Sequence, residues 1–434
     1  MPSSVPRRIS TFLGLLIIAL VAVAPASGLE IQSIVRAAEQ YQNPNLHLQT
    51  MFRAALLDTT KLAEFAPDGT AYVKTGDIPA EWLRDASAQV RPYLYYAKTD
   101  PAVRALLRAI IARQAKYVQI DPYANAFTLD YRVWEEKYEL DSLAYPITLA
   151  WSYWHETGDR TIFTPDEQKA LDAALATMQR EQNHARDSRY SHKELVNAGK
   201  GRPVGYTGMI WTGFRPSDDA CYYNYLIPSE MFAVVALGDM EQIERQVYHD
   251  GAKARAAALL RSQVRNGIEK YGMVDDKKYG RIYAFEADGL GNAIMTDDAN
   301  IPSLLSAPYI GYAKADDPYY LNTRAFLLSQ DNASYYSGNV ARGIGSYHTP
   351  DHWIWPLALV MEGLTSDSST EKQDVLNQLL ASDPGDHLLH ESFDPNDPKR
   401  YTRVDFGWPN ALFSEYILTS FGGVSPIPMG ETST

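Results

Sequence analysis

Residues 101–119 read PAVRALLRAIIARQAKYVQ, and apolar side chains recur in this stretch every three or four positions. This spacing places them on one face of an α-helix, and Pro101 suits the first helical position, where the N–H that proline lacks would have no partner inside the helix. Apolar residues recur in the same way before and after this stretch. We therefore expect about twelve to fourteen helices, the clearest at 46–65, 80–98, 101–119, 140–158, 165–183, 227–243, 252–268, 301–313, 318–330, 351–366, 370–382 and 408–421.

Strand signals are few by comparison. The clearest is GRIYAFEADGLGN (Gly280–Asn292), where Asp288 and Gly289 follow alternating residues and predict a β-hairpin. No repeat of about 20–50 residues divides the chain, and neither does a linker rich in proline, serine or threonine. We therefore predict a single domain of paired helices over residues 27–434.

The first 26 residues predict a secretory signal peptide. Arg7 and Arg8 precede the apolar run FLGLLIIALVAVA at residues 12–24, and Ala24 and Ala26 form the small-residue pattern of a cleavage site. The run is too short to span a bilayer comfortably, and an uncleaved anchor is the alternative. No later segment resembles a membrane span, so we expect a secreted or periplasmic protein with no stable membrane insertion after cleavage.

Charge and cysteine content exclude other classes. The 434 residues include 40 basic and 53 acidic ones, which gives a net charge of −13, and no run of lysine or arginine stands out. Because binding to phosphates needs a basic face, nucleic acid is not an expected partner. Cys221 is the one cysteine, so an internal disulfide is excluded and stability must come from a large core.

The segments between the predicted helices carry many Trp, Tyr, Arg, Asp and His residues. In a closed ring of helix pairs, alternate loops converge on one end, and function tends to lie on loops held by a rigid scaffold. Aromatic faces can pack on a sugar ring while charged and amide groups bond its hydroxyls. The set predicts a sugar pocket built from six loops, at residues 75–87, 131–142, 208–220, 295–303, 345–356 and 390–409.

Other chemistries have weaker support in the sequence. His348 and His352 lie four apart with Pro350 between them, His387 and His390 form a similar weak pair, and no HExxH pattern exists, so we predict no metal site. The sequence contains no G-x-S-x-G element for a nucleophilic serine and no glycine-rich loop for phosphate.

Paired carboxylates remain as candidate catalytic groups. Glycoside hydrolysis needs one carboxylic acid with a raised pKa and a second carboxylate that activates water or attacks directly. Asp218 and Asp219 lie side by side among aromatic residues and would raise each other's pKa. For the second carboxylate, composition leaves Glu391, Asp298 and Asp351 open.

Six blocks of the sequence resemble the metal-independent exo-α-1,6-mannosidase family, whose members are inverting glycoside hydrolases. The resemblance extends from about residue 46 to residue 421 and rests on EWLRDASAQVRPYL, WEEKYELDSLAYP, WTGFRPSDDACYYNYLIPSEMF, DDANIPSLLSAPYIGY, HTPDHWIWPLALVMEGL and LHESFDPNDPKRYTRVDFGWPNALFSEYI. It implies an all-α fold, an (α/α)6 toroid like that of glucoamylases, here with a minor β-hairpin. It also implies a mannose-containing oligosaccharide as substrate and no cofactor.

The resemblance further implies roles for individual residues. Asp218 of RPSDDA would be the general acid, with Asp219 as the alternative, and Glu391 of HESF would be the general base. Residues expected to bind the substrate are Arg84, Asp85, Trp211, Arg215, Asp219, Asp298, Asn300, His348 and Trp353. The alternatives are another inverting α-glycosidase of the glucoamylase or trehalase type and a non-catalytic, secreted glycan-binding protein.

Overall fold

The computed structural model describes residues 31–430, so the predicted signal peptide lies outside the described residues. Their helices are α1 Gln32–Gln40, α2 Leu46–Leu62, α3 Leu83–Gln89, α4 Arg91–Ala97, α5 Pro101–Ile120, α6 Leu140–Thr157, α7 Pro165–Glu181, α8 His184–Asp187, α9 Val196–Gly199, α10 Ile227–Gln246, α11 Gly251–Tyr271, α12 Pro318–Leu327, α13 Pro356–Leu364, α14 Ser369–Ala381 and α15 Gly407–Ser420.

The strands are all short and form six separate small sheets within the described residues. They are β1 Ala63–Phe65, β2 Ala71–Val73, β3 Glu81–Trp82, β4 Ala126–Phe127, β5 Val133–Glu135, β6 Tyr225–Leu226, β7 Met273–Asp276, β8 Gly280–Tyr283, β9 Glu286–Ala287, β10 Ala293–Ile294, β11 Tyr335–Ser337, β12 Arg342–Ile344, β13 Ser392–Asp394 and β14 Asp397–Thr402.

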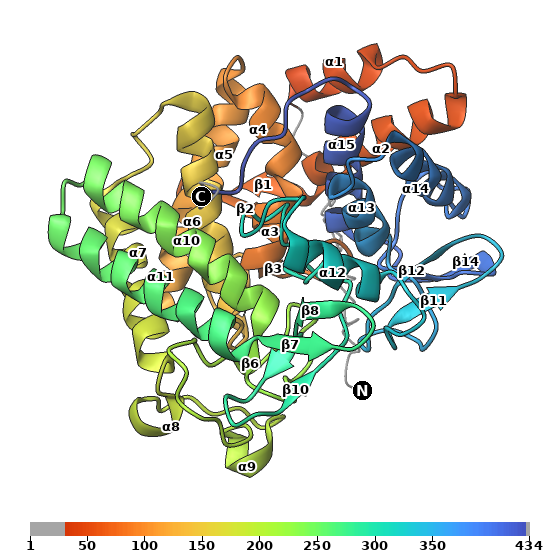
Figure 1. The fold of residues 1–434 in the computed structure, drawn as a ribbon. Helices are drawn as coiled ribbons and strands as arrows, with labels where there is room; N and C mark the ends of the chain where they lie inside the picture. The colour runs from red at the N-terminus through yellow and green to blue at the C-terminus, as the bar shows by residue number, and fades with distance from the viewer. Residues whose placement is uncertain (1–30, 431–434) are drawn as a thin grey trace, which may run out of the picture.

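The longer helices form a double ring (Figure 1). Its inner segments are buried along most of their length and are α3 with α4, α6, α10, residues 301–313, α13 and α15. They alternate along the chain with outer helices that keep an exposed face, namely α2, α5, α7, α11, α12 and α14. The ring closes where α15 packs against α2 and α3, although these elements come from opposite ends of the chain. The predicted (α/α)6 toroid is confirmed.

Inner and outer helices begin differently. Each of the six outer helices has a short polar N-cap residue whose side chain accepts backbone N–H groups of the first turn, as Asp100 does for α5. The N-cap residues of α3, α6, α10, α13 and α15 make no such bond, and most of them are large and apolar or aromatic. The inner helices therefore present uncapped N-termini, which carry partial positive charge.

The structure departs from the sequence-based prediction most clearly in two helical segments, and it adds strands around the predicted hairpin. Residues 301–313 form buried turns rather than a helix, because Pro302 and Pro308 lack N–H donors and the Asp297 carboxylate takes the N–H groups of Leu304 and Leu305. The helix predicted over 80–98 is split at Val90 into α3 and α4. The Asp288–Gly289 hairpin is confirmed as β9–β10, but further short strands surround it.

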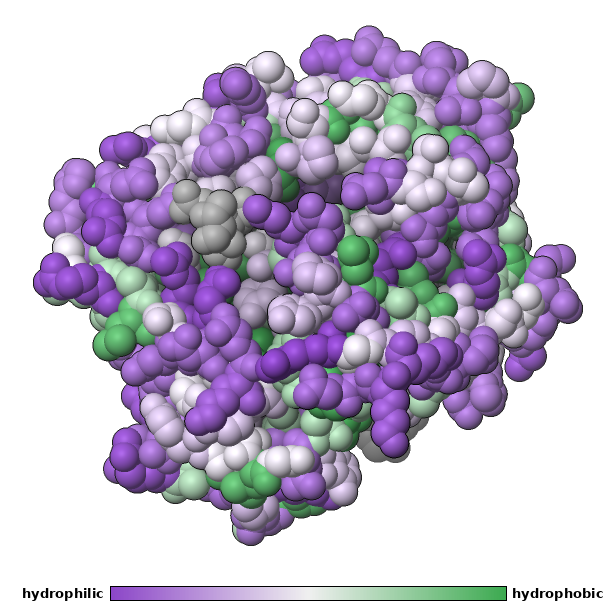
Figure 2. Space-filling view, in the orientation of Figure 1, coloured by the Kyte–Doolittle hydropathy of each residue, from purple (hydrophilic) through white to green (hydrophobic). Residues whose placement is uncertain are grey.

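The core fills the space between the two rings. The face of the molecule seen in Figure 2 is mainly hydrophilic. Figure 2 shows hydrophobic residues only in small, separate patches on that face. Within residues 31–430, no helix combines the length and the hydrophobicity that crossing a membrane requires.

Candidate active site

One cavity lies where the N-termini of the inner segments converge. It measures ≈ 230 Å³, and five of the six predicted loops contribute to it. The lining residues lie in loops that lead into inner segments or in the first turns of those segments, so the toroid itself brings these loops together. The lining consists of Thr75, Ile78, Trp82, Arg84, Asp85, Pro216, Ser217, Asp218, Asn300, His348, Trp355, Glu391, Arg403, Phe406 and Trp408.

Asp218 occupies a tight turn that projects it into the cavity. Its N–H donates to the carbonyl of Arg215 at 2.9 Å, and its φ of 65° lies in the left-handed region that costs a non-glycine residue energy. The Oδ1 atom of Asp218 accepts from Asn125 at 3.1 Å and from Arg84 at 3.4 Å. The strained backbone is therefore held by specific partners in a single orientation.

A buried cluster of acidic groups lies behind Asp218. The Arg84 guanidinium is within 3.4 Å of four carboxylates, those of Asp85, Glu139, Asp141 and Asp218, with Glu139 nearest at 2.6 Å. One cation cannot neutralise four buried anions, so this cluster retains protons near neutral pH. Burial accordingly raises the pKa of Glu139 well above its usual range, and raises that of Asp141 to about 6.

Asp218 and Glu139 share a hydrogen bond between their carboxyl groups. Burial pushes the pKa of Asp218 upward, but Arg84 and the bond to Glu139 outweigh it and bring that pKa below its usual value. The two carboxyl groups therefore titrate as a pair, in which Glu139 is the more readily protonated member. The pair is a carboxyl dyad with one member facing the cavity.

Glu391 enters the cavity from a different loop, directly before the hairpin β13–β14. Ser392 is fixed by Thr402, whose Oγ1 lies 2.7 Å from the Oγ of Ser392, and Phe393 exchanges backbone bonds with Ile354 at 2.9 and 3.0 Å. Burial raises the pKa of Glu391, opposed by the positive charges of Arg403 and His348. Glu391 is thus a carboxylate held next to a rigid hairpin, and its surroundings increase its basicity.

His348 lies among three carboxylates. Its Nδ1 is 3.6 Å from Oδ1 of Asp219, and this contact, together with the charges of Asp218 and Glu391, raises the pKa of His348 to about 9 against the effect of burial. His348 is therefore a cation at neutral pH. Ser346 positions it by accepting its backbone N–H at 3.2 Å and donating to Asp298 at 2.8 Å.

Several predicted site residues act behind the cavity rather than in its lining. Asp298 accepts from the Nδ2 of Asn300 at 2.9 Å and so orients a residue that does line the cavity. Arg215 pairs with Glu286 at 2.7 Å and supports the turn of Asp218. Asp219 contacts His348 and Ser217.

Two predicted tryptophans lie elsewhere. Trp211 is 1% exposed and stacks on His184 with ring centroids 3.6 Å apart, outside the cavity. Trp353 faces a separate surface cavity beside Arg400. Trp355, two positions further on, is the N-cap residue of α13 and lines the site instead.

The aromatic lining residues that sequence reasoning missed all lie at the starts of inner helices. Trp82, Trp355 and Phe406 are the N-cap residues of α3, α13 and α15, and Trp408 follows in the first turn of α15. All four are in the quoted sequence blocks, but only the ring geometry shows that the start of an inner helix faces the cavity. Glu139 and Asn125 were missed as partners of Asp218 because they are 79 and 93 residues away.

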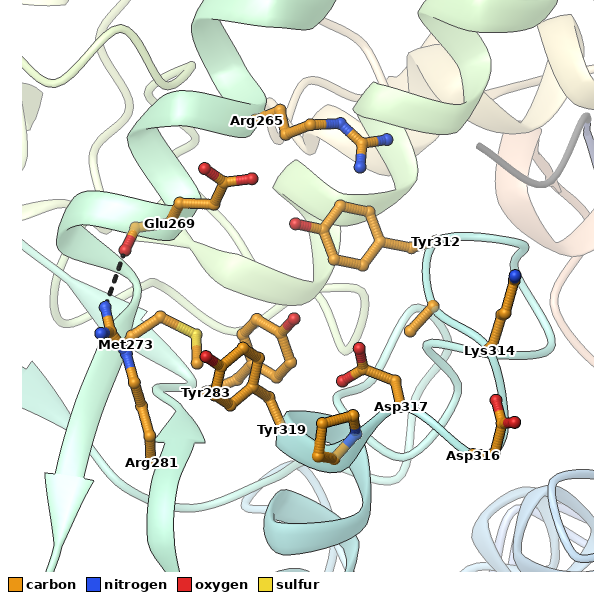
Figure 3. Close-up of a pocket in the computed structure, with 12 residues that line it drawn as sticks. Arg265, Glu269, Met273, Arg281, Tyr283, Tyr312, Lys314, Asp316, Asp317 and Tyr319 are labelled. Atoms are coloured by element: carbon orange, nitrogen blue, oxygen red, sulfur yellow. Dashed lines mark hydrogen bonds between the residues drawn. The ribbon is translucent and has the colours of Figure 1, made fainter. Parts of the chain in front are cut away.

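A larger cavity of ≈ 770 Å³ occurs at one edge of the ring (Figure 3). There Tyr283, Tyr312 and Tyr319 lie among charged side chains between the end of α11, the β7–β8 hairpin and the start of α12. Its lining comes from a single stretch of the chain, residues 265–319, and shares no residue with the carboxylate cavity. The convergence of five loops favours the smaller cavity as the candidate active site.

Comparisons with known proteins agree with this geometry. The chain is 38% identical over 386 residues to the meiotically up-regulated gene 157 protein of Schizosaccharomyces pombe, covering 80% of this chain and 76% of that one. A Streptococcus pneumoniae metal-independent α-mannosidase, solved as a non-productive substrate complex with α-1,6-mannobiose, is 40% identical with a TM-score of 0.84, over 89% of this chain and 96% of that one.

A bacterial glucoamylase complexed with acarbose shares the fold at 13% identity and a TM-score of 0.58, over 89% of this chain and 57% of that one. The family model for metal-independent α-mannosidases (GH125) matches residues 45–418, which include all lining residues of the cavity and all inner segments except the last two residues of α15. The chain therefore belongs to the GH125 family of metal-independent α-mannosidases.

Proposed function

We propose that this protein is an exo-acting α-1,6-mannosidase that releases non-reducing terminal mannose with inversion of configuration. The observation that carries the proposal is the cavity itself, where Asp218 and Glu391 come from different loops of a GH125 chain. The α-1,6 linkage is supported by the bound mannobiose of the Streptococcus pneumoniae relative. A cavity of ≈ 230 Å³ suits one terminal sugar ring better than an internal segment of a glycan chain.

The proposed reaction is a single displacement. Asp218 gives its proton to the glycosidic oxygen while the bond from that oxygen to the anomeric carbon breaks. Glu391 takes a proton from a water molecule whose oxygen forms the new bond to the anomeric carbon. The products are β-mannose and the shortened glycan, and Glu391 ends with the proton that the water loses. Aromatic residues at the helix starts exclude other water and give the sugar apolar faces.

Glu139 has a role in this scheme as the proton-holding partner of Asp218. Its carboxyl group is fully buried and is bonded to Arg84 at 2.6 Å and to Ser142 at 2.9 Å. It does not line the cavity. We propose that it keeps a proton beside Asp218 and passes it across the shared hydrogen bond as Asp218 protonates the leaving oxygen.

Substitution Glu139→Gln should shift the alkaline limb of the pH–kcat/KM profile to lower pH by at least about one unit. Without the partner carboxyl, Arg84 and Asn125 stabilise ionised Asp218 and so lower its pKa. Asp218 then loses the proton that it needs as general acid at a lower pH than in the wild type. Glu139→Asp should restore part of the shift. An unchanged alkaline limb in Glu139→Gln, with a normal melting temperature, would rule out this role.

The function itself is tested by proton NMR of the purified chain with α-1,6-mannobiose in excess EDTA. We expect β-mannose as the first product, before mutarotation produces the α-anomer. Early α-mannose would contradict single displacement. Turnover of maltose or trehalose in parallel samples, with none of mannobiose, would favour the glucoamylase-like or trehalase-like alternative, and no turnover of any of the three would favour a binding protein.

A further inference from the structure

His47, near the start of α2, meets Asp383 and His387 on the surface, although these two residues lie more than 330 positions later in the sequence. The Nε2 atom of His47 lies 2.6 Å from Oδ2 of Asp383, and the Nδ1 atom of His387 lies 3.0 Å from the same oxygen. The two imidazole nitrogens and the carboxylate oxygen all lie within 4.8 Å of one another. The sequence paired His387 only weakly with His390 and did not bring in His47, because His47 and Asp383 are 336 residues apart.

The carboxylate at the centre of this cluster is fixed in place by the backbone. The Oδ1 atom of Asp383 accepts the N–H groups of Gly385 at 2.8 Å and of His387 at 2.9 Å. Oδ2 is thereby left to face both imidazoles. Burial acts to raise the pKa of Asp383, but the bond from His47 and the two backbone N–H groups lower it below its usual value, so the group is an anion. Hydrogen bonds that orient a carboxylate in this way are typical of metal ligands.

The donor set defines the kind of ion. Two imidazole nitrogens with one carboxylate oxygen suit Zn²⁺ and similar divalent transition metals, whereas Ca²⁺ and Mg²⁺ prefer oxygen ligands alone. The side chain of Asp383 is 2% exposed, while those of His47 and His387 are 41% and 44% exposed. The protein therefore surrounds the carboxylate of Asp383, while the two imidazoles face solvent. A water molecule can then complete a tetrahedral shell around the metal ion.

We propose that His47, Asp383 and His387 form a structural binding site for Zn²⁺ or a similar divalent transition metal ion. The site joins the first turn of α2 to the segment after α14, which leads to Glu391. None of the three residues lines the active-site cavity. Leu389, nearer to Glu391, is anchored independently by Asn410, which accepts its N–H at 2.8 Å. The metal therefore stabilises the closure of the ring and takes no part in glycosidic bond cleavage.

The test uses the full chain purified without a histidine tag and stripped with EDTA. Zn²⁺ binding is measured by equilibrium dialysis, Co²⁺ binding by its visible absorption, and stability by the melting temperature with and without Zn²⁺. The variants are His47→Gln and His387→Gln. His155→Gln is a matched control, because His155 is 47% exposed and also lies 3.0 Å from one carboxylate, that of Glu156, but has no second histidine beside it.

We expect the wild type and the control to bind one equivalent of Zn²⁺ and to melt a few degrees higher when it is bound. Each variant of the cluster should lose at least tenfold in affinity, and mannosidase activity should stay the same in EDTA. Binding that is equally tight in all four proteins, or a wild type whose melting temperature Zn²⁺ does not raise, would overturn the proposal and leave the cluster held by hydrogen bonds alone.

Discussion

Glu391→Gln should lower kcat on α-1,6-mannobiose by about 10²–10⁴-fold, the usual contribution of a general base. The amide fills the same space but cannot take a proton from the attacking water. The defect should be equally large on α-mannosyl fluoride, because water must be activated whatever the leaving group is. Kinetics on both substrates, measured at one pH with purified proteins, test this expectation.

Stability and a matched variant separate catalysis from folding in this experiment. Because burial raises the pKa of Glu391, its ionised form is disfavoured in the folded state at neutral pH, so the neutral amide should leave the melting temperature unchanged or raise it. Asp351→Asn is the control, since Asp351 was an open alternative for the base but is 78% exposed and lies outside the cavity. Full activity in Glu391→Gln, or a comparable loss in Asp351→Asn, would contradict the assignment.

The same pKa shift predicts the acid limb of the pH profile. Glu391 acts as a base only when ionised, so kcat/KM should fall as the pH drops through its pKa, which burial places above the usual glutamate value. His348 and Arg403 oppose that shift by favouring the anion. We therefore expect Glu391 to set the lower bound of the active pH range, and the carboxyl pair of Asp218 and Glu139 to set the upper bound.

Local sequence patterns predicted most of the fold. The periodicity at 101–119 corresponds to α5 within one residue, and a prolyl start with a polar cap marks three of the six outer helices, α5, α7 and α12. Residues 301–313 show the limit of that approach, because two prolines and the Asp297 side chain compete with helical hydrogen bonds in a segment whose composition is helical. Tertiary burial holds this segment inside the ring without a helix.

Site residues were predictable where a sequence block contained both the loop and the start of the next helix. This held for Arg84, Asp218 and Glu391, whose side chains all reach the cavity. It failed for Trp353 and Trp355, because only the ring geometry shows that the N-cap residue of α13, Trp355, faces the cavity. It also failed for Glu139, whose contact with Asp218 exists only through the packing of α6 against α3 and α10.

Asp218→Asn should lower kcat on α-1,6-mannobiose by about 10²–10⁴-fold while reducing turnover of α-mannosyl fluoride less than about tenfold. A sugar leaving group needs a proton to depart, whereas fluoride does not. The contrast with Glu391→Gln, which fails on both substrates, assigns acid and base separately. Asparagine preserves the size of the side chain, and its amide can still bond Glu139 within the turn, so the melting temperature should change little.

Asp219→Asn decides between the two neighbouring aspartates. Asp219 points to His348 rather than lining the cavity, and its side chain is 34% exposed, against 21% for Asp218. We therefore expect less than a tenfold loss on mannobiose and no dependence on the leaving group. If Asp219→Asn instead showed the large, leaving-group-dependent defect and Asp218→Asn did not, the acid would be Asp219, and the dyad of Asp218 with Glu139 would serve only to hold the turn. The buried proton beside Asp218, the strained φ that directs it inward and the single guanidinium facing four acids all favour the first outcome.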